Sequence, residues 1–273
     1  MEDSLKRLIS LGSFSQKKMT SIFFEYRDYS SYQDFMNDVL TNLEFDELEI
    51  RMENGTVYER FLLDDASPYE LILSFVSPSH ISHTSALDLR GILPQNNCYY
   101  CTNSFTKKHS ANIEPISQEQ LNLSFSKPAR KTNNRTVIKD DTLVLFQAKN
   151  IEVGIQDIEH NGRLLKASSI TRAFIEIVMK PEYFGGEKGV LKICSEVKDD
   201  IDVYEIVEYF KEAKFVYPYI QLVAYYLDKV KALSDQDKQL LKDSKKDLNI
   251  YTEREMEKFS FNQEWGVYHL EGS

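Results

Sequence analysis

The residues best suited to chemistry in this sequence are acidic side chains that stand close to an amide and a lysine. Asp140-Asp141 is followed by Gln147-Ala-Lys149. Some nucleases carry an acidic residue on one strand and the pattern acid-or-amide, any residue, lysine on the next strand. Such a group of side chains can hold a metal ion and activate water for phosphodiester cleavage. Glutamine is a weak ligand, and no third ligand can be named here. A metal-dependent nuclease centred on Asp141, Gln147 and Lys149 is therefore an alternative hypothesis.

Two further spacings are typical of metal ligands, but neither is complete. His80 and His83 lie three residues apart without a nearby third ligand, so we expect a histidine hydrogen-bonded at a helix start. Cys98 and Cys101 enclose two tyrosines in a predicted strand, where residues three apart face opposite ways. With Cys194 the chain has three cysteines, which do not suggest a secreted disulfide framework. We expect no metal and no cofactor.

The motifs that usually mark an enzyme are missing from the sequence. No glycine-rich phosphate loop follows a predicted strand, and neither G-x-S-x-G nor H-E-x-x-H occurs. The sequence therefore favours a protein that is not an enzyme.

The charges exclude a protein coated in positive charge but allow a local basic patch. The net charge is −10 for 273 residues, and an acidic body can still bind DNA through clustered cations. Residues 126–135 form the densest basic stretch, which is either a solvated loop or a loop that contacts phosphate. The candidate DNA-binding residues are Lys17, Lys18, Arg51, Arg60, Lys127, Arg130, Lys131 and Arg135.

Residues 1–65 have the element order of a winged helix-turn-helix domain. Apolar spacing predicts a first helix that Gly12 can end, a second from Ser15 and a third from Ser30 or Ser31. Alternating residues around Asn54-Gly55 then predict a β-hairpin.

The third helix makes DNA recognition by this domain ambiguous. Its polar residues are amides and acids without lysine or arginine, namely Gln33, Asp34, Asn37, Asp38 and Asn42. Amides can read base edges, whereas aspartates repel phosphate. DNA binding and a degenerate winged helix that contacts a protein partner both remain open.

Residues 66–273 predict a mixed α/β domain with a mostly antiparallel sheet and a helical end, so the fold class is α+β. A helix over 68–75 precedes the histidine segment, and Asn161-Gly162 marks a tight turn. The tail from Trp265 to Leu270 alternates like a closing edge strand. The predicted strands cover 98–105, 113–116, 137–138, 143–148 and 151–158.

The segment from Lys166 to Gly186 predicts a helix with one buried face and a tight exit. Ser168 or Ser169 can cap its start, and Arg172 and Glu176 lie one turn apart and can pair. Pro181 cannot continue the helix, and Gly185-Gly186 supply unusual backbone angles.

This order of residues resembles the C-terminal domain of the AbiEi-type antitoxins. In that family a segment close to E-R-T-L-L-D precedes P-E-x-x-G-G, and here Arg172 takes the arginine position, Glu176 the aspartate position, and Thr171 replaces the glutamate. The stretch 81–87 is similar to the family's Ile-Ser-His-x-Ser-Ala-Leu, and 223–228 to its Leu-Gly-Tyr-Leu-Leu-Glu without the glycine. The matching positions are His83, Ser85, Arg172, Glu176, Pro181, Glu182, Gly185 and Gly186.

The resemblance implies an antitoxin-like transcriptional regulator. Such a protein would repress its own operon by binding promoter DNA through the winged helix. Its C-terminal domain would counter a nucleotidyltransferase-like toxin. We expect a cytoplasmic protein with no membrane association, because no apolar run approaches the length of a spanning helix. The oligomeric state cannot be read from the sequence.

Overall fold

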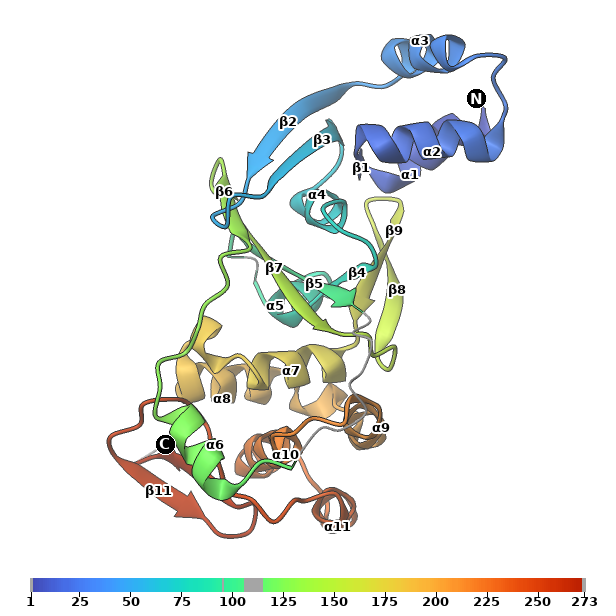
Figure 1. Cartoon of the computed structure of the whole chain (residues 1–273). Helices are drawn as coiled ribbons and strands as arrows, with labels where there is room; N and C mark the ends of the chain where they lie inside the picture. Colours follow the sequence, from blue (N-terminus) through green and yellow to red (C-terminus); the bar gives the residue numbers. More distant parts are fainter. Residues whose placement is uncertain (1, 95, 106–114, 272–273) are drawn as a thin grey trace.

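A computed structural model describes residues 2–94, 96–105 and 115–271. The elements form three groups along an elongated molecule: helices at the N-terminal end, a twisted sheet in the middle and helices with a small sheet at the far end (Figure 1). This is the α+β arrangement that the sequence predicts.

The N-terminal group has the winged-helix order. Ser15 and Ser31 cap α2 and α3, as predicted, by accepting hydrogen bonds from the backbone amides of Lys18 and Asp34. The strands pair in the order β1-β3-β2, all antiparallel. The elements are α1 (Asp3–Leu11), β1 (Ser13–Phe14), α2 (Gln16–Tyr26), α3 (Tyr32–Asn42), β2 (Phe45–Arg51) and β3 (Val57–Leu63).

The hairpin between β2 and β3, which is the wing, is docked on the central sheet. Its tip donates backbone hydrogen bonds from Glu53 to the Arg135 carbonyl at 2.9 Å and from Asn54 to the Asn133 carbonyl at 3.0 Å. Ile50 and Met52 at its far end are buried in the large core of residues 66–273. The helices α1 to α3 enclose a separate core. The wing therefore contributes to the large core, which extends across residue 65, and the division at that residue stays a prediction.

The central six-stranded sheet has the order β6-β7-β5-β4-β9-β8. The pairs β5–β7 and β4–β9 are parallel and the other three are antiparallel, which confirms a mostly antiparallel sheet. The turn at Asn161-Gly162 joins β8 to β9 as predicted. The elements of this region are α4 (Pro68–Leu73), β4 (Ser79–Ile81), α5 (His83–Asp88), β5 (Cys98–Phe105), β6 (Arg135–Ile138), β7 (Asp141–Lys149), β8 (Ile155–His160) and β9 (Arg163–Ser168).

Three predictions in the strand-rich region need correction. The strand expected over 151–158 begins only at Ile155, because residues 151–154 form the loop before β8. The strand expected over 113–116 falls partly outside the described residues, and Pro115 and Ile116 are not in a strand. A helix, α6 (Gln118–Phe125), follows where only strands were expected. Ser117 and Gln120 form a capping box at its start, and that spacing was the signal that could have revealed it.

The far end is helical, with one small three-stranded sheet. The predicted closing strand at the C-terminus forms, but β12 lies in the middle of the sheet order β10-β12-β11 and not at its edge. Trp265, just before it, is fully buried. The elements are α7 (Ile170–Val178), the 3-10 helices Pro181–Tyr183 and Lys198–Asp200, α8 (Gly186–Val197), α9 (Val203–Ala213), α10 (Tyr219–Lys229), α11 (Asp235–Asp243), β10 (Ile250–Tyr251), β11 (Phe259–Asn262) and β12 (Val267–Leu270).

Within the residues that the structure describes, none of the helices combines the length and the apolar character needed to cross a membrane.

Candidate functional site

The paired side chains of α7 lie in a buried polar cluster beneath the central sheet. Arg172 Nε donates to Glu176 Oε1 at 2.9 Å, and both side chains are almost completely buried. The other Glu176 oxygen accepts from Ser168 Oγ at 2.8 Å and from the backbone amide of His83 at 3.2 Å. The predicted pair is thus confirmed, and it ties α7 to β9 and to the start of α5.

The two histidines, His80 and His83, complete this cluster. His80 Nε2 lies 3.2 Å from Glu176 Oε1, and His83 Nδ1 lies 2.8 Å from Ser82 Oγ. Burial lowers the pKa of His83 to about 4, against the opposing charge of Glu176. Burial alone would raise the pKa of Glu176, but the His80 hydrogen bond and the Arg172 charge hold it well below its usual range. The cluster therefore holds an ionised carboxylate beside a neutral His83 at neutral pH.

The guanidinium of Arg172 also satisfies backbone groups on the opposite side. Its Nη1 donates to the carbonyls of Ile151 and Val153, both at 2.7 Å, and its carbon lies 5.5 Å from the Tyr209 ring centre. A buried cation with this set of acceptors is positioned to hold the loop between β7 and β8 against α7. This arrangement is structural, because Nε and Nη1 of Arg172 and both carboxylate oxygens of Glu176 are used inside the fold.

The Pro-Glu-x-x-Gly-Gly segment forms the tight exit that the sequence predicts. Pro181–Tyr183 is a 3-10 turn, and Gly185 and Gly186, at the start of α8, have φ of 83° and 66°. One further glycine is required nearby, because a Cβ on Gly189 would lie 1.7 Å from the Phe184 carbonyl oxygen. Ser85, the remaining family position, accepts from the Tyr100 amide at 2.8 Å and fixes α5 to β5.

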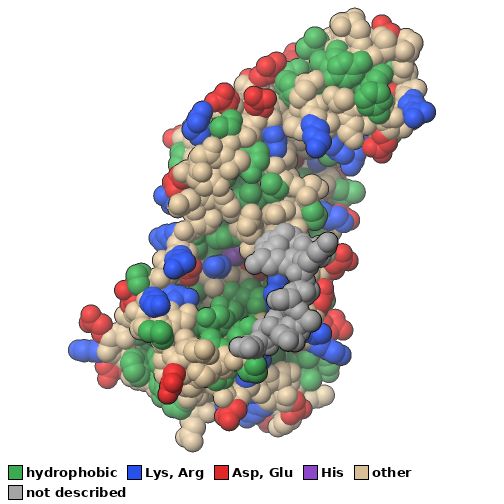
Figure 2. All heavy atoms as spheres, viewed as in Figure 1, with side chains coloured by type: hydrophobic (Ala, Val, Ile, Leu, Met, Phe, Trp, Pro, Cys, Tyr) green, Lys and Arg blue, Asp and Glu red, His purple; other side chains and the backbone are tan. Residues whose placement is uncertain are grey.

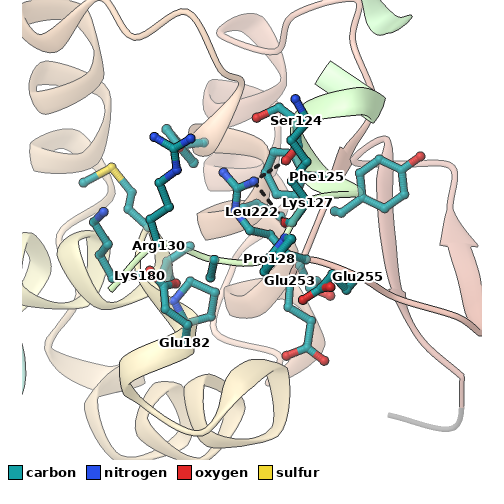
Figure 3. Close-up of a pocket in the computed structure, with 18 of the residues that line it drawn as sticks. Ser124, Phe125, Lys127, Pro128, Arg130, Lys180, Glu182, Leu222, Glu253 and Glu255 are labelled. Atoms are coloured by element: carbon teal, nitrogen blue, oxygen red, sulfur yellow. Dashed lines mark hydrogen bonds between the residues drawn. The ribbon is translucent and has the colours of Figure 1, made fainter. Parts of the chain in front are cut away.

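A groove lies against this exit turn, and the basic loop forms part of its wall. The groove has a volume of about 680 Å³ and is lined by Lys127, Arg130, Pro181 and Glu182 together with residues of α6, α10 and the 251–255 segment (Figure 3). The structure therefore brings the turn and the loop together, although they are about 50 residues apart in the sequence.

The other two cations of the loop lie outside the groove. Lys131 Nζ lies 5.9 Å from the centre of the Tyr183 ring. Arg135 Nε donates to Glu53 Oε1 of the wing at 2.7 Å.

The four N-terminal residues predicted to bind DNA do not form a single exposed basic surface. Lys17 and Lys18 are exposed in the first turn of α2. Arg51 is exposed on the wing beside Glu49, at 3.4 Å. Arg60 is used inside the fold, since its guanidinium donates to the carbonyls of Ser74 and Phe75 at 3.0 and 2.9 Å.

On α3 the aspartates accept hydrogen bonds from nearby side chains, whereas the amides of Gln33 and Asn37 are exposed. Gln33 and Asn37 are exposed, one turn apart, and hydrogen-bonded to each other at 3.0 Å. Asp38 accepts from Tyr29 and from Asn42, while Asp34 accepts from the hydroxyls of Ser30 and Ser31. Local donors therefore engage both carboxylates, while the amides face outward.

The alternative nuclease residues do not converge. Asp141, Gln147 and Lys149 all lie on the single strand β7, not on two strands as hypothesised. Asp141 and Gln147 are about 20 Å apart along an extended strand, and Lys149 Nζ donates to the Ala213 carbonyl at 3.1 Å. Among the described residues no three His, Cys, Asp or Glu side chains are grouped so that they could hold a metal ion. The proposed metal arrangement is therefore wrong.

Together these features define a two-part α+β protein: a winged-helix unit joined through its wing to a mixed-sheet domain with a helical end. The Rv2827c protein from Mycobacterium tuberculosis has a similar solved structure, with a TM-score of 0.52 and 10% sequence identity over 94% of this chain and 86% of that chain. At this identity the likeness shows a shared fold and no more. Comparisons with protein-family models and with curated proteins found no match.

Proposed function

We propose that the protein is an antitoxin-like transcriptional regulator that binds promoter DNA of its own operon through the N-terminal unit. The observation that carries this proposal is the complete winged-helix order with an exposed amide face on α3. Glutamine and asparagine are the side chains that pair with adenine edges in the major groove. Lys17 and Lys18, at the start of the preceding helix, supply the cations for phosphate.

The docked wing restricts how DNA can be bound. Its tip is hydrogen-bonded to residues 133–135 and cannot enter a minor groove without leaving the sheet. The DNA contacts in this proposal therefore come from α2 and α3 alone, and Arg60 takes no part.

The second part of the proposal concerns the C-terminal domain, which would counter a nucleotidyltransferase-like toxin. It is supported by the resemblance of the Arg172, Glu176 and Pro181–Gly186 positions to AbiEi-type antitoxins, and by the shared fold with Rv2827c. The buried cluster around Glu176 serves this role by holding the domain together, not by contacting the toxin.

A reporter assay tests both parts in the full-length chain. A reporter gene behind the protein's own promoter should be repressed by the wild type and released by Lys17→Glu/Lys18→Glu. The same double variant should still restore growth when it is co-expressed with a nucleotidyltransferase-like toxin, because the C-terminal domain is unchanged. Equal repression by the variant and the wild type would contradict DNA binding through α2. Loss of growth rescue by the wild type would contradict the antitoxin role.

One observation favours a second candidate, a protein-binding module built on a degenerate winged helix. Phe24 on α2 and Leu40 on α3 are 63% and 62% exposed, and apolar side chains gather on this end of the molecule (Figure 2). Exposed apolar surface of this kind marks many protein contacts. In that case Phe24→Ser/Leu40→Ser would abolish partner binding while Lys17→Glu/Lys18→Glu would not.

A further inference from the structure

The groove beside the exit turn contains cations that the proposed function does not use. Lys127, Arg130 and Lys180 line it and make no hydrogen bond or ion pair through their side chains within the described part of the chain. The helices α6 and α10, which contribute to its lining, lie at the opposite end of the molecule from α3 (Figure 1). DNA bound on α3 therefore leaves these cations free for a different anion.

The groove has the size of a small-molecule site. Its volume of about 680 Å³ falls within the roughly 300–1,000 Å³ that ligand pockets occupy. Leu123, which is 60% exposed, and Met179 supply apolar surface in its lining. Phe125 and Tyr251 also line it, but their rings stack on each other, Tyr251 stacks on Tyr268 as well, and the Arg254 guanidinium lies over Phe125. The apolar part of a ligand can therefore pack against the aliphatic side chains of the lining.

Carboxylates occupy the other side of the groove. Figure 3 shows Arg130 and Lys180 on one side and Glu253 and Glu255 on the other, and the structure contains no ion pair between them. Glu182 lies on the side of Arg130 in the same view. Repeated carboxylates oppose a continuous phosphate backbone, but a carboxylate is a good acceptor for sugar hydroxyls. The ligand should therefore carry its negative charge at one end and hydrogen-bond donors at the other.

We propose that this groove binds a free nucleotide. Arg130 and Lys180 take the phosphates, because guanidinium and ammonium groups are the common phosphate donors. Glu255 accepts from the ribose hydroxyls, and the base packs against the apolar lining. This site goes beyond the proposed regulator function and gives the protein a small-molecule effector.

Isothermal titration calorimetry of the full-length chain tests the assignment. ATP, GTP, CTP and UTP are titrated separately in magnesium-free buffer, with inorganic triphosphate and the free nucleosides as comparisons. At least one nucleotide should bind more tightly than both inorganic triphosphate and its own nucleoside. Arg130→Glu should weaken that binding by about tenfold or more, since it reverses a charge at the phosphates. Glu255→Ala, which removes the acceptor for the ribose hydroxyls, should reduce the preference over inorganic triphosphate.

The control is Lys17→Glu/Lys18→Glu, which should bind the nucleotide like the wild type, so that a failure of DNA binding and a failure of this site are distinguishable. An unchanged circular dichroism spectrum establishes that each variant is folded. Equal affinity for inorganic triphosphate and for nucleotides would overturn the proposal in favour of a simple anion patch. Absence of heat with all four nucleotides, or full binding by folded Arg130→Glu, would overturn it as well.

Discussion

At the scale of single residues, the buried carboxylate of Glu176 holds several elements of the fold together. Its two carboxylate oxygens accept from Arg172, His80, Ser168 and the amide of His83. A buried carboxylate is tolerated only when its lone pairs are used in this way. The four donors come from different elements, so Glu176 connects β4, α5, β9 and α7.

Removing this carboxylate should destabilise the protein strongly. Glu176→Ala leaves the Arg172 cation buried without its partner, and breaking such a pair costs about 3–5 kcal/mol. We expect a loss of this size in the free energy of unfolding, measured by urea denaturation followed by circular dichroism. The control is Glu182→Ala on the groove wall, which should change stability by less than about 0.5 kcal/mol. If both variants lost a similarly small amount of unfolding free energy, Glu176 would not hold these elements together.

His83 should make stability depend on pH in a defined window. Its pKa is about 4 in the folded protein, against roughly 6.5 in an unfolded chain. Between these values the unfolded chain binds the extra proton, so stability is complete above pH 6.5 and falls as the pH is lowered to 4. The loss should approach about 3 kcal/mol.

The measurement is urea denaturation at intervals between pH 7 and pH 4, for the wild type and for His83→Phe, which keeps an aromatic ring beside Phe146. The variant should have a lower but flatter stability over this window. Equal slopes would show that His83 does not titrate in this way. Glu176, whose pKa is depressed, contributes in a separate window below about pH 4.5.

The sequence predicts the local part of this site and not the long-range part. Arg172 and Glu176 lie four residues apart on one helix, so their pairing follows from helical geometry. The contacts of His80 and His83 with Glu176 span more than 90 residues. No local spacing encodes such a contact, and the histidines were therefore predicted only as helix-start residues.

At the scale of elements, turn and capping residues explain which hairpins the sequence predicts correctly and which helix it leaves out. The Asn-Gly pairs at 54–55 and 161–162 mark real hairpins, because positive φ is easily adopted there. The helix α6 was missed although Ser117 and Gln120 have capping-box spacing. The segments on either side of α6 have strand-like sequence patterns, and the two-residue capping signal is weaker than those patterns. The placement of β12 inside its sheet depends on pairing with β10, which sequence periodicity does not reveal.

The close approach of α8 to the exit turn should make Gly189 irreplaceable. An added methyl group would lie 1.7 Å from the Phe184 carbonyl oxygen, so Gly189→Ala must displace the backbone. Gly91→Ala is the matched control, since it meets no atom within 4 Å and only its φ of 68° opposes a side chain. We expect a loss of more than about 3 kcal/mol for Gly189→Ala and about 1 kcal/mol for Gly91→Ala. Thermal unfolding compares them, and equal shifts in Tm would contradict the close approach.

At the scale of the whole molecule, the docked wing separates two charged regions. Lys17 and Lys18 lie on the N-terminal helices, whereas Lys127 and Arg130 line the groove at the other end. The sequence could identify both sets but not their separation, which depends on how the hairpin packs against β6. We therefore expect the two sets to serve different ligands.

The docking also predicts that the wing contributes little to DNA affinity. Arg51 is exposed beside Glu49 on a hairpin whose tip is bonded to the sheet. Arg51→Glu should therefore weaken binding to promoter DNA by less than about threefold, the effect of a distant charge in salt. Fluorescence anisotropy at fixed ionic strength measures it. A loss as large as that of Lys17→Glu/Lys18→Glu would show that the wing contacts DNA after all.

The proposal that the N-terminal unit binds promoter DNA is tested most directly by measuring DNA binding of the full-length chain at a series of salt concentrations. DNA from upstream of the protein's own gene is compared with a scrambled duplex, using fluorescence anisotropy at several salt concentrations. We expect selective binding that weakens as the salt concentration rises, that is lost in Lys17→Glu/Lys18→Glu, and that is unchanged in Lys127→Glu/Arg130→Glu. Equal weak binding to both duplexes, or no binding, would contradict a winged-helix regulator and favour the protein-binding alternative.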